Sequence, residues 1–119
     1  MSDSSAQSIK QLKIKTGVVK RLHKEESVYV KEVVDQKKVV KKMKDENAEG
    51  ADIRAAERVL RDSEMMVPRT RKQLEEAVQS LDDLVTALQG EESISSSQEY
   101  KNAAAQLKEV ENALQAQSS

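Results

Sequence analysis

The sequence has no cysteine, one histidine, one proline, three glycines and neither Trp nor Phe among its 119 residues. Without cysteine there is no disulfide framework, thiolate nucleophile or zinc finger, and a single histidine excludes a metal site built on several histidines. All-β sandwiches and barrels need many turns, and this chain has little glycine or proline to build them. No run of 18 apolar residues is present, so we expect no membrane-spanning helix. The first ten residues lack the apolar core of a signal peptide, and we expect an intracellular protein.

Apolar and charged residues are abundant, at 37% and 34% of the chain. The net charge of -1 hides an uneven distribution. Residues 1–44 hold 12 Lys and Arg against 5 Asp and Glu, whereas residues 45–119 hold 8 against 16. This composition favours long helices with few connections, and the short chain predicts a single domain.

Apolar residues spaced three and four apart predict a helix over about 9–45. Seven of its ten seam positions are apolar, and three further valines widen the stripe. A wide stripe indicates a helix that faces two neighbours. The seam is Leu12, Lys15, Val19, Leu22, Glu26, Tyr29, Val33, Gln36, Val40 and Met43, and the widening residues are Val18, Val30 and Val34.

A second segment, over about 52–89, has the clearest heptad pattern, with nine of eleven seam positions apolar. Asp52 is the predicted N-cap and Gly90 the predicted C′ residue. Arg71 and Glu75, four apart and off the seam, are expected to pair on the solvated face. The seam is Ile53, Ala56, Leu60, Ser63, Val67, Thr70, Leu74, Ala77, Leu81, Leu84 and Leu88.

A third segment, over about 96–116, places five apolar residues at the same spacing, and Ser96 to Glu99 is predicted to form its capping box. Short connections between long helices require antiparallel neighbours. The sequence therefore predicts an all-α, elongated, coiled-coil-like antiparallel three-helix bundle. Residues 9–116 form its single domain, with flexible ends at 1–8 and 117–119. The third seam is Tyr100, Ala103, Leu107, Val110 and Leu114.

Pro68 lies inside the second helix, and the heptads continue in phase on both sides of it. Its missing N–H cannot bond the Glu64 carbonyl, so we predict a bend in the helix at Pro68. The bend either shapes a surface for a partner or simply curves the helix. The alternative architecture has four helices with a turn at Pro68. Met65 and Met66 either contact a partner or fill gaps beside the bend.

Two sets of basic residues in the first helix are candidates for binding. One is the amphipathic run from Lys37 to Lys44. Membrane helices favour Trp or Phe anchors, which the run lacks. Calmodulin, an acidic protein partner and a merely solvated face remain as interpretations of this run. For the larger set, the absence of interleaved aromatics and the isoelectric point of about 5.9 disfavour nucleic acid. The larger set is Lys13, Lys15, Lys20, Arg21, Lys24 and Lys31.

No residue pattern indicates catalysis. His23 lies in a polar stretch and is interpreted as a solvated side chain. The serines at 93–97 have no base partner and are better explained as loop and cap. We therefore expect no enzyme activity, no metal and no cofactor.

Three stretches carry a resemblance to a known family. They are KIKTGVVKRL at 13–22, DSEMMVP at 62–68 and EYKNA at 99–103. In these stretches the chain resembles the tubulin-specific chaperone A family, also called tubulin-folding cofactor A, and the resemblance covers about 10–105. The chain departs from the family pattern in the turn from Asn47 to Ala51 and directly after Pro68.

The resemblance implies an elongated three-helix bundle with a proline-bent second helix that acts without ATP hydrolysis. Such proteins capture quasi-native β-tubulin after its release from the cytosolic chaperonin and pass it to later tubulin-folding cofactors for pairing with α-tubulin. It implies a cytoplasmic, cytoskeleton-associated protein that is a monomer or weak homodimer and binds neither nucleic acid nor membrane. A structural coiled-coil scaffold is the alternative. The candidate β-tubulin contacts are Lys13, Lys15, Lys20, Arg21, Lys24, Lys31, Met65, Met66 and Pro68.

Overall fold

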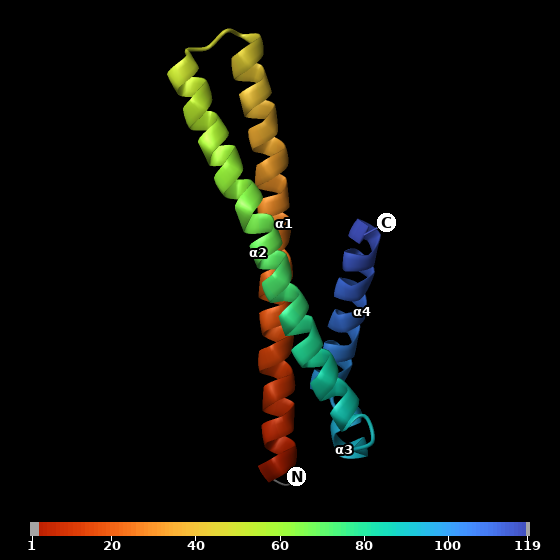
Figure 1. Ribbon diagram of the computed structural model, residues 1–119. Coiled ribbons are helices and arrows are strands. Elements are labelled where there is room, and N and C mark those ends of the chain that lie inside the picture. Colours follow the sequence, from red (N-terminus) through yellow and green to blue (C-terminus); the bar gives the residue numbers. More distant parts are fainter. Residues whose placement is uncertain (1–2, 119) are drawn as a thin grey trace. The chain divides into compact units, whose positions relative to one another are not determined.

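The computed structural model describes residues 3–118, and within this range the chain is helical with no strand. The helices are α1 (Asp3–Asp45), α2 (Gly50–Leu88), α3 (Glu92–Ser95) and α4 (Gln98–Ser118) (Figure 1). The predicted all-α class is confirmed. The count of three was short by one, because the connection predicted as a loop contains the one-turn helix α3.

The helix ends differ from the predicted ones by a few residues. α1 begins at Asp3, six residues before the expected start at 9, whereas the expectation for residues 1, 2 and 119 lies outside the described residues. α2 begins at Gly50, so Asp52 is not its N-cap. Asp52 lies in the first turn, where a carboxylate favours the positive end of the helix dipole.

The turn between α1 and α2 is closed by Asn47, a residue in the left-handed region with φ 56°. The Asn47 N–H donates to the Lys44 carbonyl at 3.1 Å, and the Ala48 N–H donates to the Met43 carbonyl at 2.9 Å. These two bonds form a Schellman motif, which satisfies carbonyls at the end of α1 and reverses the chain. Gly90 does not play this part after α2, because its φ is not positive and the chain passes directly into α3.

Ser97, not Ser96, caps α4. The Ser97 hydroxyl oxygen accepts the Tyr100 N–H at 3.2 Å, the N3 bond of an N-cap. The Ser96 hydroxyl instead donates to the Glu92 carbonyl at 2.7 Å and belongs to the end of α3. The predicted capping box was therefore wrong by one residue. Ile94 of α3 is 1% exposed and anchors this corner in the core.

The contacts divide the chain into two compact units. The bundle unit consists of Met1–His23 and Gln73–Ser119, within the described residues, and the hairpin unit is Lys24–Lys72. Each is described by itself, and the single-domain organisation stays a prediction.

The bundle unit contains the apolar core of the protein. α1, α2 and α4 each contribute seam residues to it, and the predicted third helix packs as expected. The Tyr100 hydroxyl donates to the Val85 carbonyl at 3.4 Å and links α4 to α2. The buried residues are Leu12, Val19, Leu22, Leu74, Val78, Leu81, Leu88, Ile94, Ala103, Leu107 and Val110.

The hairpin unit pairs the second half of α1 with the first half of α2, antiparallel across the turn (Figure 1). Its buried seam includes Val40, Ala56 and the carboxylate of Glu26, which has no exposed surface. Arg71 of α2 lies 3.2 Å from Glu26, Nη2 to Oε1. Arg71 therefore reaches across to α1, and its predicted pairing with Glu75 on the solvated face was wrong.

α2 runs through Pro68 without a break, so the alternative with a chain reversal at Pro68 is excluded. The position of Pro68 is exposed, where its ring can be accommodated at the helix surface. The bend of α2 at this residue stays a prediction.

Candidate protein-binding surface

Residues 3–118 offer no metal centre, since no group of three or more His, Asp and Glu side chains there could hold an ion. No helix in this range is both long and apolar enough to span a bilayer. The candidate functional residues are therefore considered as contact surfaces, one unit at a time.

In the bundle unit, the structure separates the candidate lysines of α1. Lys13 and Lys20 are exposed and share a pocket of about 300 Å³ between α1 and α4. Lys15 is turned toward α2 instead, where its Nζ donates to the Ser80 hydroxyl oxygen at 2.7 Å. Arg21 is exposed on α1. The pocket is lined by Lys13, Thr16, Gly17, Lys20, Glu99 and Asn102.

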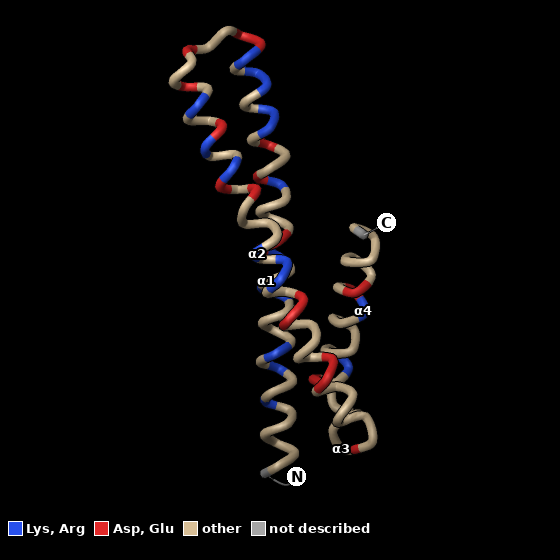
Figure 2. The backbone as a smooth tube through the Cα atoms, viewed as in Figure 1, with Lys and Arg blue, Asp and Glu red and all other residues tan. Residues whose placement is uncertain are grey.

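In the hairpin unit, exposed lysines recur along one face of α1. Lys24, Lys31, Lys38 and Lys42 are spaced by seven, seven and four residues, which keeps them on the same side of a helix. Figure 2 shows how densely basic residues follow α1 toward its turn with α2. Lys31 Nζ lies 3.0 Å from Asp35 Oδ2, an exposed pair four residues apart. Lys42 Nζ lies 4.0 Å from Glu46 Oε1 in a second such pair. Exposed pairs of this kind are weak, so a partner protein can compete for these lysines.

Met65, Met66 and Pro68 all lie on α2 of the hairpin unit, but they differ in exposure. Met65 is 70% exposed, and Pro68 is also exposed. Met66 is half-buried and packs partly within the hairpin. Met65 is therefore the methionine best placed to contact a partner, with a flexible side chain that adapts to different surfaces.

Exposed valines of the hairpin unit were missed by the sequence analysis. Val30 and Val34 were expected to face a second neighbour, but they are 38% and 47% exposed. The reason is that this unit contains only α1 and α2, because α4 belongs to the bundle unit. The sequence did contain a signal for this exposure. The third predicted helix has 21 residues, which is too short to cover the whole length of the first predicted helix over 9–45. Val28, Val39 and Val59 are exposed as well.

The hairpin unit thus combines solvent-facing apolar side chains with a row of lysines. Exposed apolar groups release ordered water when a partner covers them, and flanking charges select the partner by its sign. This arrangement suits an acidic protein surface.

The model of the family described as tubulin binding cofactor A matches residues 7–107. The chain is 41% identical over 95 residues to tubulin-specific chaperone A of Homo sapiens, covering 80% of this chain and 85% of that one. It superposes on the crystal structure of tubulin folding cofactor A from Arabidopsis thaliana with a TM-score of 0.79 and 36% identity, over 90% of this chain and 98% of that one. For human tubulin chaperone cofactor a, the TM-score is 0.72 at 36% identity, over 87% and 98%.

The match includes the basic first helix, the second helix with its internal proline and the start of α4. The identity extends over most of both chains, and the fold agrees. The chain belongs to the tubulin binding cofactor A family.

Proposed function

We propose that the protein is a tubulin-folding chaperone that captures quasi-native β-tubulin after its release from the cytosolic chaperonin. The observation that carries this proposal is the family match over residues 7–107, which takes in helices of both units. The named relatives are tubulin-specific chaperones, and the comparison covers most of their length.

The mechanism is capture by contact. β-Tubulin without its α-tubulin partner exposes a surface that the heterodimer buries, and exposed apolar surface promotes aggregation. The valines of the hairpin unit and Met65 cover such a surface, while the lysines of α1 steer the acidic tubulin toward it. The apolar contacts hold the partner and the charges accelerate the encounter.

Handover follows from competition. A later tubulin-folding cofactor that binds the same β-tubulin more tightly displaces this protein and presents β-tubulin for pairing with α-tubulin. The protein takes part by binding and release alone, in the cytoplasm, as a monomer or weak homodimer.

The test is the rate at which the protein captures purified, non-assembled β-tubulin. The double variant Lys20→Glu/Lys24→Glu reverses two exposed charges on α1. Its matched control, Lys101→Glu/Lys108→Glu, makes the same change at exposed positions of α4. We expect the association rate of the α1 variant to fall about tenfold at low salt. Above about 0.5 M salt screening should remove the difference, because the Debye length falls toward ~3 Å.

Equal association rates for the two double variants would refute the steering role of α1. A wild-type protein that fails to bind β-tubulin at micromolar concentration would refute the proposed function itself.

A further inference from the structure

A groove runs between α1 and α2 in the bundle unit, and α4 contributes no residue to its lining. Two adjoining hollows form it, of about 610 and 170 Å³, and they share Lys15 and Ser80. The larger is lined by Lys15, Glu76, Gln79, Ser80, Asp83, Leu84 and Ala87.

The smaller hollow, between α1 and α2, holds most of the apolar residues of the groove. Ile14 lines it at 47% exposure, beside the half-buried Val18 and Ala77. Residues 77, 80 and 87 are Ala or Ser, and short side chains let another helix approach closely. Ile14, Val18 and Ala77 therefore form a short apolar strip between the two helices.

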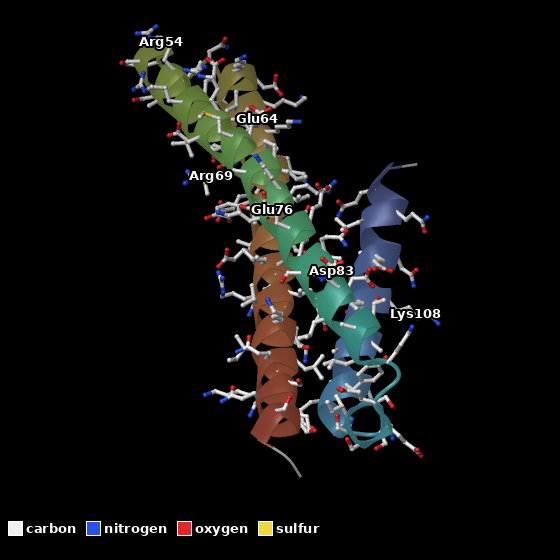
Figure 3. All side chains as sticks on the ribbon, turned by 60° about the horizontal axis from the view of Figure 1, so that its bottom comes forward. Arg54, Glu64, Arg69, Glu76, Asp83 and Lys108 are labelled. Atoms are coloured by element: carbon white, nitrogen blue, oxygen red, sulfur yellow. The ribbon has the colours of Figure 1, made fainter. Side chains whose placement is uncertain are left out.

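The rim of the groove is acidic on the α2 side. Glu76 and Asp83 line the larger hollow and lie one heptad apart on α2, about 10.5 Å along the helix axis. Figure 3 shows both labelled residues along the same helix. The Asp83 carboxylate accepts the Gln79 side-chain N–H at 2.8 Å, and no ion pair joins either carboxylate to a described residue. Two acidic groups at this spacing attract basic groups at the same spacing.

Lys15 is the basic residue on the floor, and its bond to Ser80 holds it against α2. Its alkyl stem covers part of the apolar strip while its ammonium stays at the surface. A helix that enters the groove can cover this stem and leave the hydroxyl bond in place. The carboxylates on the α2 side determine which way such a helix turns its basic side.

We propose that this groove docks an amphipathic helix of the captured β-tubulin, with an apolar stripe against Ile14 and Leu84 and two basic residues seven apart facing Glu76 and Asp83. The inference rests on the proposed function and adds a second contact, opposite in charge to the lysine row of the hairpin unit.

The first experiment compares two charge reversals in the bundle unit. Glu76→Lys/Asp83→Lys changes the rim of the groove, and Glu109→Lys/Glu111→Lys makes the same change at exposed positions of α4. We expect the groove variant to bind purified β-tubulin at least fivefold more weakly than the control. Circular dichroism and urea unfolding of both variants establish that their helices are intact.

The second experiment maps the contact directly. A photocrosslinking amino acid replaces Ile14 in the groove or, as the control, Ala104 on the exposed side of α4. We expect position 14 to crosslink β-tubulin at least tenfold more efficiently than position 104. Mass spectrometry should place the crosslink in a helical segment with Lys or Arg seven residues apart.

Wild-type capture of β-tubulin, together with equal binding by the two double variants and no crosslink from position 14, would overturn the groove while leaving the proposed function standing. A crosslink to a segment without paired basic residues would overturn the assigned occupant. Failure of the wild type to bind β-tubulin would overturn both proposals.

Discussion

Burial of the Glu26 carboxylate carries an electrostatic cost for the hairpin unit. The carboxylate has no exposed surface and is held by Arg71, whose side chain is 28% exposed. Within the described residues, Glu26 Oε2 and Arg71 Nε have no hydrogen-bond partner. A buried pair with unmet bonds contributes little net stability, but loss of one member leaves a charge without compensation. We therefore expect the pair to specify how α1 and α2 align more than it stabilises them.

Arg71→Leu should lower the free energy of unfolding by about 3 kcal/mol, because it leaves the Glu26 carboxylate buried and unpaired. The double variant Glu26→Leu/Arg71→Leu should lie within about 1 kcal/mol of the wild type, or above it, since an apolar pair fills the same seam. Urea unfolding followed by circular dichroism measures both. A single variant that costs as little as the double variant would show that the pair is not coupled.

At the scale of a single helix, the seams were predictable and the ends were not. Every seam position of α1, from Leu12 to Met43, is buried or half-buried, because spacing alone decides which side of a helix meets a neighbour. Each end depends on only one or two local hydrogen bonds. Ser96 and Ser97 both suit a cap, and only the backbone path through α3 decides between them.

The helix α2 stays continuous at Pro68, although proline removes one hydrogen bond of the helix. α2 continues through it because seam residues on both sides are held by packing, although the Glu64 carbonyl loses its usual donor. Pro68→Ala restores that donor and removes the ring, but it also makes the unfolded chain more flexible. We expect a net gain of about 1–2 kcal/mol in the free energy of unfolding.

The control for this change is Arg69→Ala, which alters the next exposed position of α2 without touching the hydrogen-bond ladder and should stay within about 0.5 kcal/mol of the wild type. Thermal and urea unfolding supply the comparison. A loss of stability in Pro68→Ala would mean that the ring makes favourable contacts that outweigh the missing bond.

At the scale of the whole molecule, the sequence predicted that the surface of α1 is basic better than it predicted which residues of α1 are exposed. The basic character of α1 follows from composition, and Lys13, Lys20, Lys24 and Lys31 are all exposed. Lys15 is not available in the same way, because its bond to Ser80 depends on how α1 and α2 pack. Val30 and Val34 are exposed because the hairpin unit contains only α1 and α2, and the apolar spacing within α1 does not show how many helices pack beside it.

The two units differ in how their helices are held, and this predicts a difference in local stability. The apolar core cluster lies in the bundle unit, whereas each helix of the hairpin unit has one neighbour and its seam includes Glu26. Regions with few buried apolar contacts open at lower free energy and exchange amide hydrogens faster. Within α1, we expect amides of residues 28–44 to exchange at least tenfold faster than those of residues 12–22, a difference of about 1.4 kcal/mol. Hydrogen exchange read by mass spectrometry compares the two segments inside one continuous helix, so their intrinsic geometry is matched. Uniform protection along α1 would show that opening is global, with the hairpin held as firmly as the bundle.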